Sequence, residues 1–114
     1  MQNEADLAYL IEMMQNASGG DDYFDKQIRN YLDLPAMLVP PDGGDEAYPY
    51  TQNINCALLL TLPDMLWMVG HIDSYGTLYS AVINYAKREW KATAKTPELA
   101  ICIAILKAIR DTCL

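Results

Sequence analysis

The sequence has few of the residues that carry most enzyme and metal chemistry. It contains one histidine, His71, and three cysteines far apart in the chain, Cys56, Cys102 and Cys113. A structural zinc site needs four ligands at short spacing, and a nucleophilic triad needs a nucleophile, a base and an orienting group. No glycine-rich phosphate loop occurs either. The sequence therefore predicts no catalytic residue, no cofactor and no metal. We interpret His71 as the end of a strand; the alternative is a base acting with Asp73 or a tyrosine.

Long apolar runs and secretory signals are also missing. The longest run, Leu99 to Leu106, has eight residues, whereas crossing a bilayer takes ~20. The start, MQNEADLAYL, has no basic region and no cleavage site of the kind that marks a signal peptide. An odd number of scattered cysteines fits a reducing compartment. We expect no membrane association, and we expect the cysteines to be small buried thiols.

Basic residues are scarce in the first two thirds of the chain. Residues 1–73 hold 12 acidic and 2 basic residues, a net charge of −10, while residues 74–114 hold 3 acidic and 6 basic, a net +3. An acidic surface repels phosphates, which disfavours direct nucleic-acid binding. The exception is a basic cluster, interpreted as a solvated strand and turn rather than a phosphate site: Lys87, Arg88, Lys91 and Lys95.

The length of 114 residues allows a single domain, 1–114, with one core. Apolar residues at 3–4 spacing predict helices over 3–17 and 21–32, and a third begins at Thr51 or Asn53 as its cap. Prolines and glycines predict a long loop over 33–50. We interpret its PDGGDE block as a loop and not as a calcium site, because the ligand pattern of an EF-hand is missing.

The middle of the chain has the composition of strands. Residues 65–73, 77–86 and 90–95 predict three strands joined by short turns, an antiparallel meander. In the first two strands both alternating sets of side chains are largely apolar. An antiparallel sheet with one wet face alternates cleanly. We therefore expect both faces of this sheet to be covered by helices.

The most apolar segment is the last helix, 96–112, which Thr96 caps and Pro97 opens. Its apolar residues leave only a narrow polar sector, so the helix must be covered by the sheet and by a neighbouring helix or a second subunit. Burying Ile101 and Ile105 contributes ~1.5–3 kcal/mol each. The predicted fold is α+β: a short antiparallel meander of two or three strands sandwiched between about four helices, self-associating through the 96–112 face.

Aromatic and basic residues concentrate in and around the predicted sheet. Surfaces rich in tyrosine and tryptophan are frequent recognition surfaces; the alternative is that these rings fill the covered faces of the sheet. The predicted binding surface consists of Trp67, His71, Tyr75, Tyr79, Lys87, Arg88, Trp90 and Lys91.

Several segments together resemble a known family. Pro49-Tyr50-Thr51 followed by an alanine/leucine helix, and Thr96-Pro97-Glu98-Leu99-Ala100 opening the last helix, are similar to the phage ABA sandwich domain family, over most of the chain. Segments 35–48 and 73–76 depart from it. The resemblance implies helices flanking a short antiparallel sheet and a phage or prophage protein in the host bacterial cytoplasm. It implies no catalytic residue, because the family has no established activity.

We therefore expect a small phage accessory protein that acts by non-enzymatic binding as a homo-oligomer. Two alternatives remain open. One is a counter-defence protein that inhibits a host immune protein through its acidic surface, imitating nucleic acid. The other sequesters a small nucleotide signal with Lys87, Arg88, Lys91 and the nearby aromatic rings.

Overall fold

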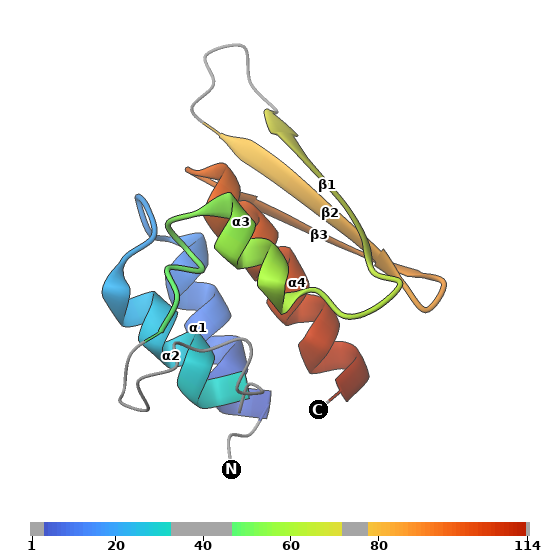
Figure 1. Cartoon of the computed structure of the whole chain (residues 1–114), viewed down its shortest axis with the longest axis horizontal. Helices are drawn as coiled ribbons and strands as arrows, with labels where there is room; N and C mark the ends of the chain where they lie inside the picture. The colour runs from blue at the N-terminus through green and yellow to red at the C-terminus, as the bar shows by residue number, and fades with distance from the viewer. Residues whose placement is uncertain (1–3, 33–46, 72–77, 114) are drawn as a thin grey trace.

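The computed structural model describes residues 4–32, 47–71 and 78–113, which form an α+β fold as the sequence predicts (Figure 1). Its three strands form one antiparallel sheet in the order β1-β2-β3, again as predicted. The helices are α1 (Glu4–Gln15), α2 (Asp22–Leu32), α3 (Ile54–Ala57), the 3-10 turn η2 (Leu58–Leu60) and α4 (Pro97–Cys113); the strands are β1 (Leu66–His71), β2 (Tyr79–Tyr85) and β3 (Arg88–Ala94).

The helix starts follow the capping residues. The Leu99 amide donates a hydrogen bond to Thr96 Oγ1 at 3.1 Å, and Pro97 is the first residue of α4. Asn53, one of the two predicted caps, begins α3 by accepting a hydrogen bond from the Cys56 amide at 3.2 Å. Both predicted starts are confirmed. The third helix is shorter than expected, because it tightens into η2 after one turn.

A tight turn sets the register of β2 and β3. Ala86 and Lys87 both have positive φ, 53° and 63°, which matches the primed two-residue turns that suit the twist of a hairpin. The turn therefore ends at Lys87, and Tyr85 pairs directly with Arg88. The third strand begins at Arg88 rather than at the predicted Trp90, because the turn occupies Ala86 and Lys87 and not the predicted residues 87–89.

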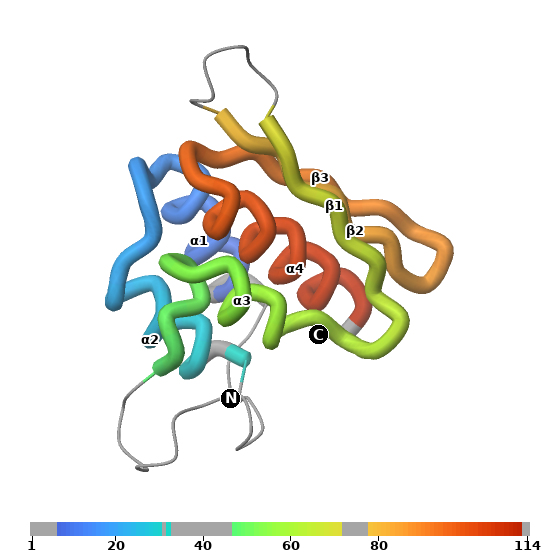
Figure 2. Tube along the Cα trace, turned by 45° about the horizontal axis from the view of Figure 1, so that its top comes forward, coloured from blue at the N-terminus to red at the C-terminus, as the bar shows by residue number. Residues whose placement is uncertain are grey.

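The helix α4 lies at the centre of the fold. All residues from Leu99 to Leu106 are buried, and Ile101 and Ile105 are fully inaccessible to solvent. Helix α4 contacts the sheet on one side and α1 and α3 on the other (Figure 2). The expected cover from sheet and neighbouring helices is confirmed. Self-association through the 96–112 face is wrong, because the described part of this helix has no exposed apolar side chain left to offer.

The two faces of the sheet differ. On the inner face, Ile83, Trp90 and Ala92 are buried against α4. On the outer face, Asn84, Glu89, Lys91 and Thr93 are exposed. The expectation that helices cover both faces is therefore wrong for the described residues: the helices all lie on one side of the sheet (Figure 1). The reason is that α4 needs cover all around itself, so α1 and α3 pack on α4 instead of on the outer face.

A close contact joins the start of α2 to the segment before α3. A Cβ added to Gly20 would lie 1.8 Å from the carbonyl oxygen of Thr51, well inside any allowed approach. Thr51 itself is almost fully buried. Glycine is required here because only a hydrogen atom fits between the two backbones.

We expect Gly20→Ala to lower the free energy of unfolding by about 2–3 kcal/mol, because the methyl group must push the Gly20 backbone away from that of the buried Thr51. Gly19→Ala is the matched control. A Cβ there would meet only the Thr96 methyl group at 3.9 Å, and the change should shift stability by less than about 1 kcal/mol. Urea denaturation followed by circular dichroism measures both; equal effects of the two variants would contradict this account.

Candidate functional site

The largest exposed apolar side chains of the sheet lie together on β1. Leu66 is 68% exposed, Met68 65% and Trp67 44%. Residues paired across an antiparallel ladder share a face. Leu66 and Met68 pair with Asn84 and Val82 on the outer face, and Trp67 pairs with Ile83 on the inner face. We call Leu66, Trp67 and Met68 the β1 patch.

The position of α4 explains why the patch is exposed. Helix α4 packs mainly beneath β2 and β3 and reaches β1 less. Strand β1 is also an edge of the sheet, so it has a ladder partner on one side only. Next to the patch the outer face is hollowed by a pocket of about 370 Å³, lined by Met68, Val69, Gly70, His71, Ser80 and Val82. Within the part of the chain that the structure describes, strand β1 is thus open on its outer face and along its edge.

The opposite edge, β3, is occupied by polar groups. Lys107 of α4 donates a hydrogen bond to the carbonyl of Lys91 at 3.1 Å, and Arg88 reaches the Asp111 carbonyl at 3.5 Å. Glu89 is also exposed on this strand. Charged side chains on an edge strand discourage pairing with another chain. No charge of this kind lies on β1, whose sequence is LWMVGH, so the two edges are built differently.

The four described ring-bearing members of the predicted surface lie on the inner face, in two separate groups. Trp67 and Trp90 both flank Ile83 in the ladder. His71 and Tyr79 pair at the other end, with their rings edge to face at 5.2 Å. Four residues of strand, roughly 13 Å, separate the two groups.

The three basic members of the predicted surface do not gather with the aromatic ones at a common site. Arg88 alone of the three stacks on a ring, 4.7 Å above that of Trp90, while Lys87 is in the turn. Lys91 is on the outer face, beside Glu89 at 3.9 Å. Tyr75 lies outside the described residues. This arrangement gives no support to a nucleotide site formed by Lys87, Arg88, Lys91 and the rings.

Trp90 has a structural partner instead. Its indole Nε1 donates a hydrogen bond to Asp111 Oδ2 at 2.8 Å, and Arg110 Nε donates to Oδ1 at 2.9 Å. The hydrogen bond from Arg110, with that from Trp90, holds the pKa of Asp111 below its ordinary value. The group therefore fastens the end of α4 to β3.

Sequence patterns missed the outer-face members of the β1 patch, Leu66 and Met68. Their apolar character predicted a covered face. The available signal was the uncharged run from Leu66 to Val69 in a strand at one end of the meander, where no second strand shields it.

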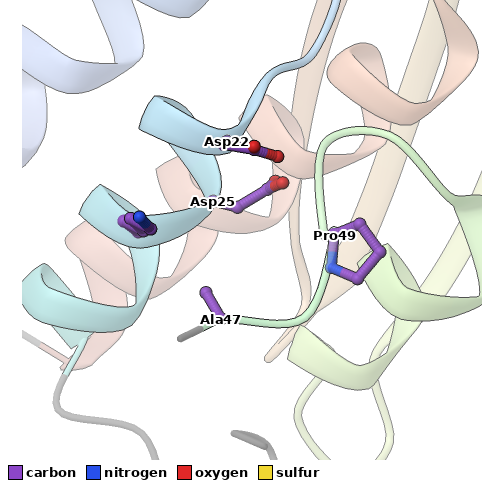
Figure 3. Close-up of a pocket in the computed structure, with 5 residues that line it drawn as sticks. Asp22, Asp25, Ala47 and Pro49 are labelled. Carbon is purple, nitrogen blue, oxygen red and sulfur yellow. The ribbon is translucent and has the colours of Figure 1, made fainter. Parts of the chain in front are cut away.

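A second hollow, of about 380 Å³, lies between α2 and the segment 47–49 (Figure 3). Asp22 and Asp25 point from α2 toward the Pro49 segment, beside Ala47; Lys26 completes the lining. Asp25 is buried and accepts three hydrogen bonds: from the Thr51 amide at 2.7 Å, from Thr51 Oγ1 at 2.6 Å and from Gln52 Nε2 at 2.8 Å. Gln52 also donates to Asp22. These carboxylates tie the loop to α2.

The described ranges contain neither a group of metal ligands nor a membrane-spanning helix. Within residues 4–32, 47–71 and 78–113, no group of three or more histidine, cysteine or acidic residues is placed to hold a metal ion. None of the helices described in the same ranges has the length and apolar content to cross a membrane.

Two of the three thiols have pKa values raised by burial. Cys102 is fully buried and donates a hydrogen bond to the Tyr50 carbonyl at 3.1 Å, and burial raises its pKa well above the ordinary value. Cys56 is half-buried, and desolvation raises its pKa as well. Burial also raises the pKa of Tyr50 to about 12. The predicted buried thiol is confirmed for Cys102; the side chain of Cys113 lies outside the described ones.

In comparisons with known proteins, no family model, no curated protein and no solved structure matches this chain.

We expect Asp25→Ala to lower the free energy of unfolding by about 3 kcal/mol, because it removes three hydrogen bonds to a carboxylate and leaves the buried Thr51 amide without its acceptor. Asp22→Ala is the control. It lies one turn away on the same helix, is exposed, and should cost less than about 1 kcal/mol. Chemical denaturation gives both values. If Asp25→Ala were as mild as the control, the network would not be a structural tie.

Proposed function

We propose that this protein acts by non-enzymatic binding, as a homo-oligomer that associates through the β1 side of its sheet. The observation that carries the proposal is the exposure of Leu66 and Met68, at 68% and 65%. Large apolar side chains gathered on an exposed strand mark interaction surfaces. The resemblance of the sequence to the phage ABA sandwich domain family supports an accessory role in the host bacterial cytoplasm.

The environment of the polar clusters also supports binding over catalysis. Asp25 is held by Thr51 and Gln52, and Asp111 by Trp90 and Arg110. Both clusters join one element of the fold to another. The β1 patch, in contrast, has no described helix over it, and burying a leucine or methionine side chain is worth about 1.5–3 kcal/mol.

We expect the wild-type protein to sediment as an oligomer at about 100 µM, and Met68→Lys to shift it to monomer with at least about a tenfold weaker association. A charge on an edge strand must be desolvated when another chain pairs with it. Thr93→Lys is the control, because it adds the same charge to the outer face at β3, where Thr93 is already exposed, and should leave assembly intact.

Sedimentation velocity at several concentrations measures the association, and circular dichroism confirms that both variants are folded. A wild-type protein that stays monomeric at the highest concentration would overturn the proposal. So would a loss of assembly in Thr93→Lys equal to that in Met68→Lys.

A second candidate is counter-defence through the acidic surface, and the distribution of charge favours it. Glu12, Asp21 and Asp22 are exposed on and beside α1 and α2, whereas Arg88 and Lys91 are exposed on the sheet. An acidic surface attracts basic proteins and does so less as salt rises.

The test uses purified wild type and the double variant Glu12→Gln/Asp22→Asn as baits for a host lysate. We expect one dominant basic protein on the wild-type bait, released by raised salt and at least about tenfold weaker on the variant. Asp21 is left unchanged because its side chain accepts a hydrogen bond from the Phe24 amide. If the amount of captured protein changed neither with salt nor between the two baits, this candidate would be contradicted.

A further inference from the structure

We propose that two copies of this chain pair β1 to β1, antiparallel, about a two-fold axis perpendicular to the sheet, so that Met68 lies opposite its counterpart. The two sheets then become one of six strands. The inference rests on the proposed function and specifies the partner and the geometry of the same surface. Strand pairing is a recurrent way to use an open edge.

The edge and not the outer face is the contact surface. Stacking two outer faces would bury Asn84, Glu89 and Lys91, all exposed on the outer face, and buried polar groups without partners are costly. Edge pairing leaves these groups in water. It also provides hydrogen-bond partners for backbone groups of β1 that face away from β2.

Symmetry restricts how two identical edges can pair. In an antiparallel ladder, opposite residues point to the same face, and a two-fold axis perpendicular to the sheet preserves this for two copies. Outer-face residues then meet outer-face residues, and the helices of both copies lie on the same side of the joined sheet.

Side-chain size selects the register. With Met68 opposite itself, Leu66 lies opposite Gly70, and Trp67 lies opposite Val69. A side-chain atom at Gly70 would meet nothing within 4 Å, so there is open space for the Leu66 side chain of the second copy. Shifting the centre to Val69 places Met68 opposite Gly70 but leaves Leu66 opposite residue 72, outside β1. The register centred on Met68 pairs residues 66–70 of β1, including every member of the β1 patch, whereas a register centred on Trp67 would pair only residues 66–68.

Charge favours a second copy as the occupant. From Leu66 to Gly70 the strand carries no charge, so self-pairing brings no like charges together. The exposed carboxylates of Asp21 and Asp22 lie just before α2 and at its first residue, and α2 packs on α1. Two molecules with a net charge of −7 each can therefore approach through a strand segment that carries none of that charge. An interface limited to one strand edge from each copy belongs to the smaller, weaker class of protein–protein interfaces, whose association depends on concentration.

The test is cysteine crosslinking of the full chain. The background is Cys56→Ser/Cys113→Ser, with the fully buried Cys102 retained. A short thiol crosslinker that spans about 5 Å matches opposite Cβ atoms in a ladder. We expect Met68→Cys to give a covalent dimer, and a mixture of Leu66→Cys with Gly70→Cys to give a mixed dimer.

The controls are Leu66→Cys alone and Val82→Cys alone. In the proposed register Leu66 lies roughly 13 Å along the strands from its counterpart, and Val82 lies one strand further in. Neither should crosslink to itself, whereas Val82→Cys would do so if outer faces stacked. All variants are first checked for native circular dichroism.

The outcomes separate this inference from the proposed function. An oligomer in which Met68→Cys fails to crosslink, or in which Leu66→Cys or Val82→Cys does so alone, overturns the edge pairing but leaves the association. A monomer at all concentrations overturns both. Crosslinks at Met68 and between Leu66 and Gly70, with the controls negative, support the pairing and its register.

Discussion

The burial of α4 on all sides is the constraint on which the rest of the structure depends. Its residues from Leu99 to Leu106 are all inaccessible or nearly so, and a helix that is apolar all around can exist in water only if other elements enclose it. The sheet covers one side, and α1 and α3 cover the other. The capping group of Thr96 and the hydrogen bond from Trp90 to Asp111 fasten its two ends.

The need to bury α4 determines where the other helices pack. Helices α1 and α3 pack on α4, and α2 packs on α1, so none of the described helices reaches the outer face of the sheet. The layers run from sheet to α4 to the remaining helices (Figure 2). The β1 patch is thus exposed because the described helices pack around α4 and not over the outer face of the sheet.

The elements that local rules control could be predicted from the sequence. Asn53 and Thr96 cap helices because their side chains accept the first free amides, and alternation of side chains identifies the three strands. The last turn lies at Ala86 and Lys87 and not at the predicted residues 87–89. Both residues have positive φ, and the sequence has no glycine there that would indicate this conformation. Which face of the sheet the helices cover could not be predicted, because the identity of an apolar residue such as Met68 does not indicate whether a helix or solvent lies over it. The hydrogen bonds of Asp25 join residues 26 and 27 positions apart, and no local pattern reports such a contact.

The difference between the two edges of the sheet limits how many copies of the chain can assemble through strand pairing. Strand β3 is closed off by Lys107 and Arg88, so each molecule offers one edge and not two. If that edge is used symmetrically, joining a second molecule consumes the open edges of both, and nothing remains to recruit a third. An uncharged, exposed edge strand that could otherwise keep adding copies is then used up in a finite assembly, because the side chains of Lys107 and Arg88 occupy the β3 edge of the same sheet.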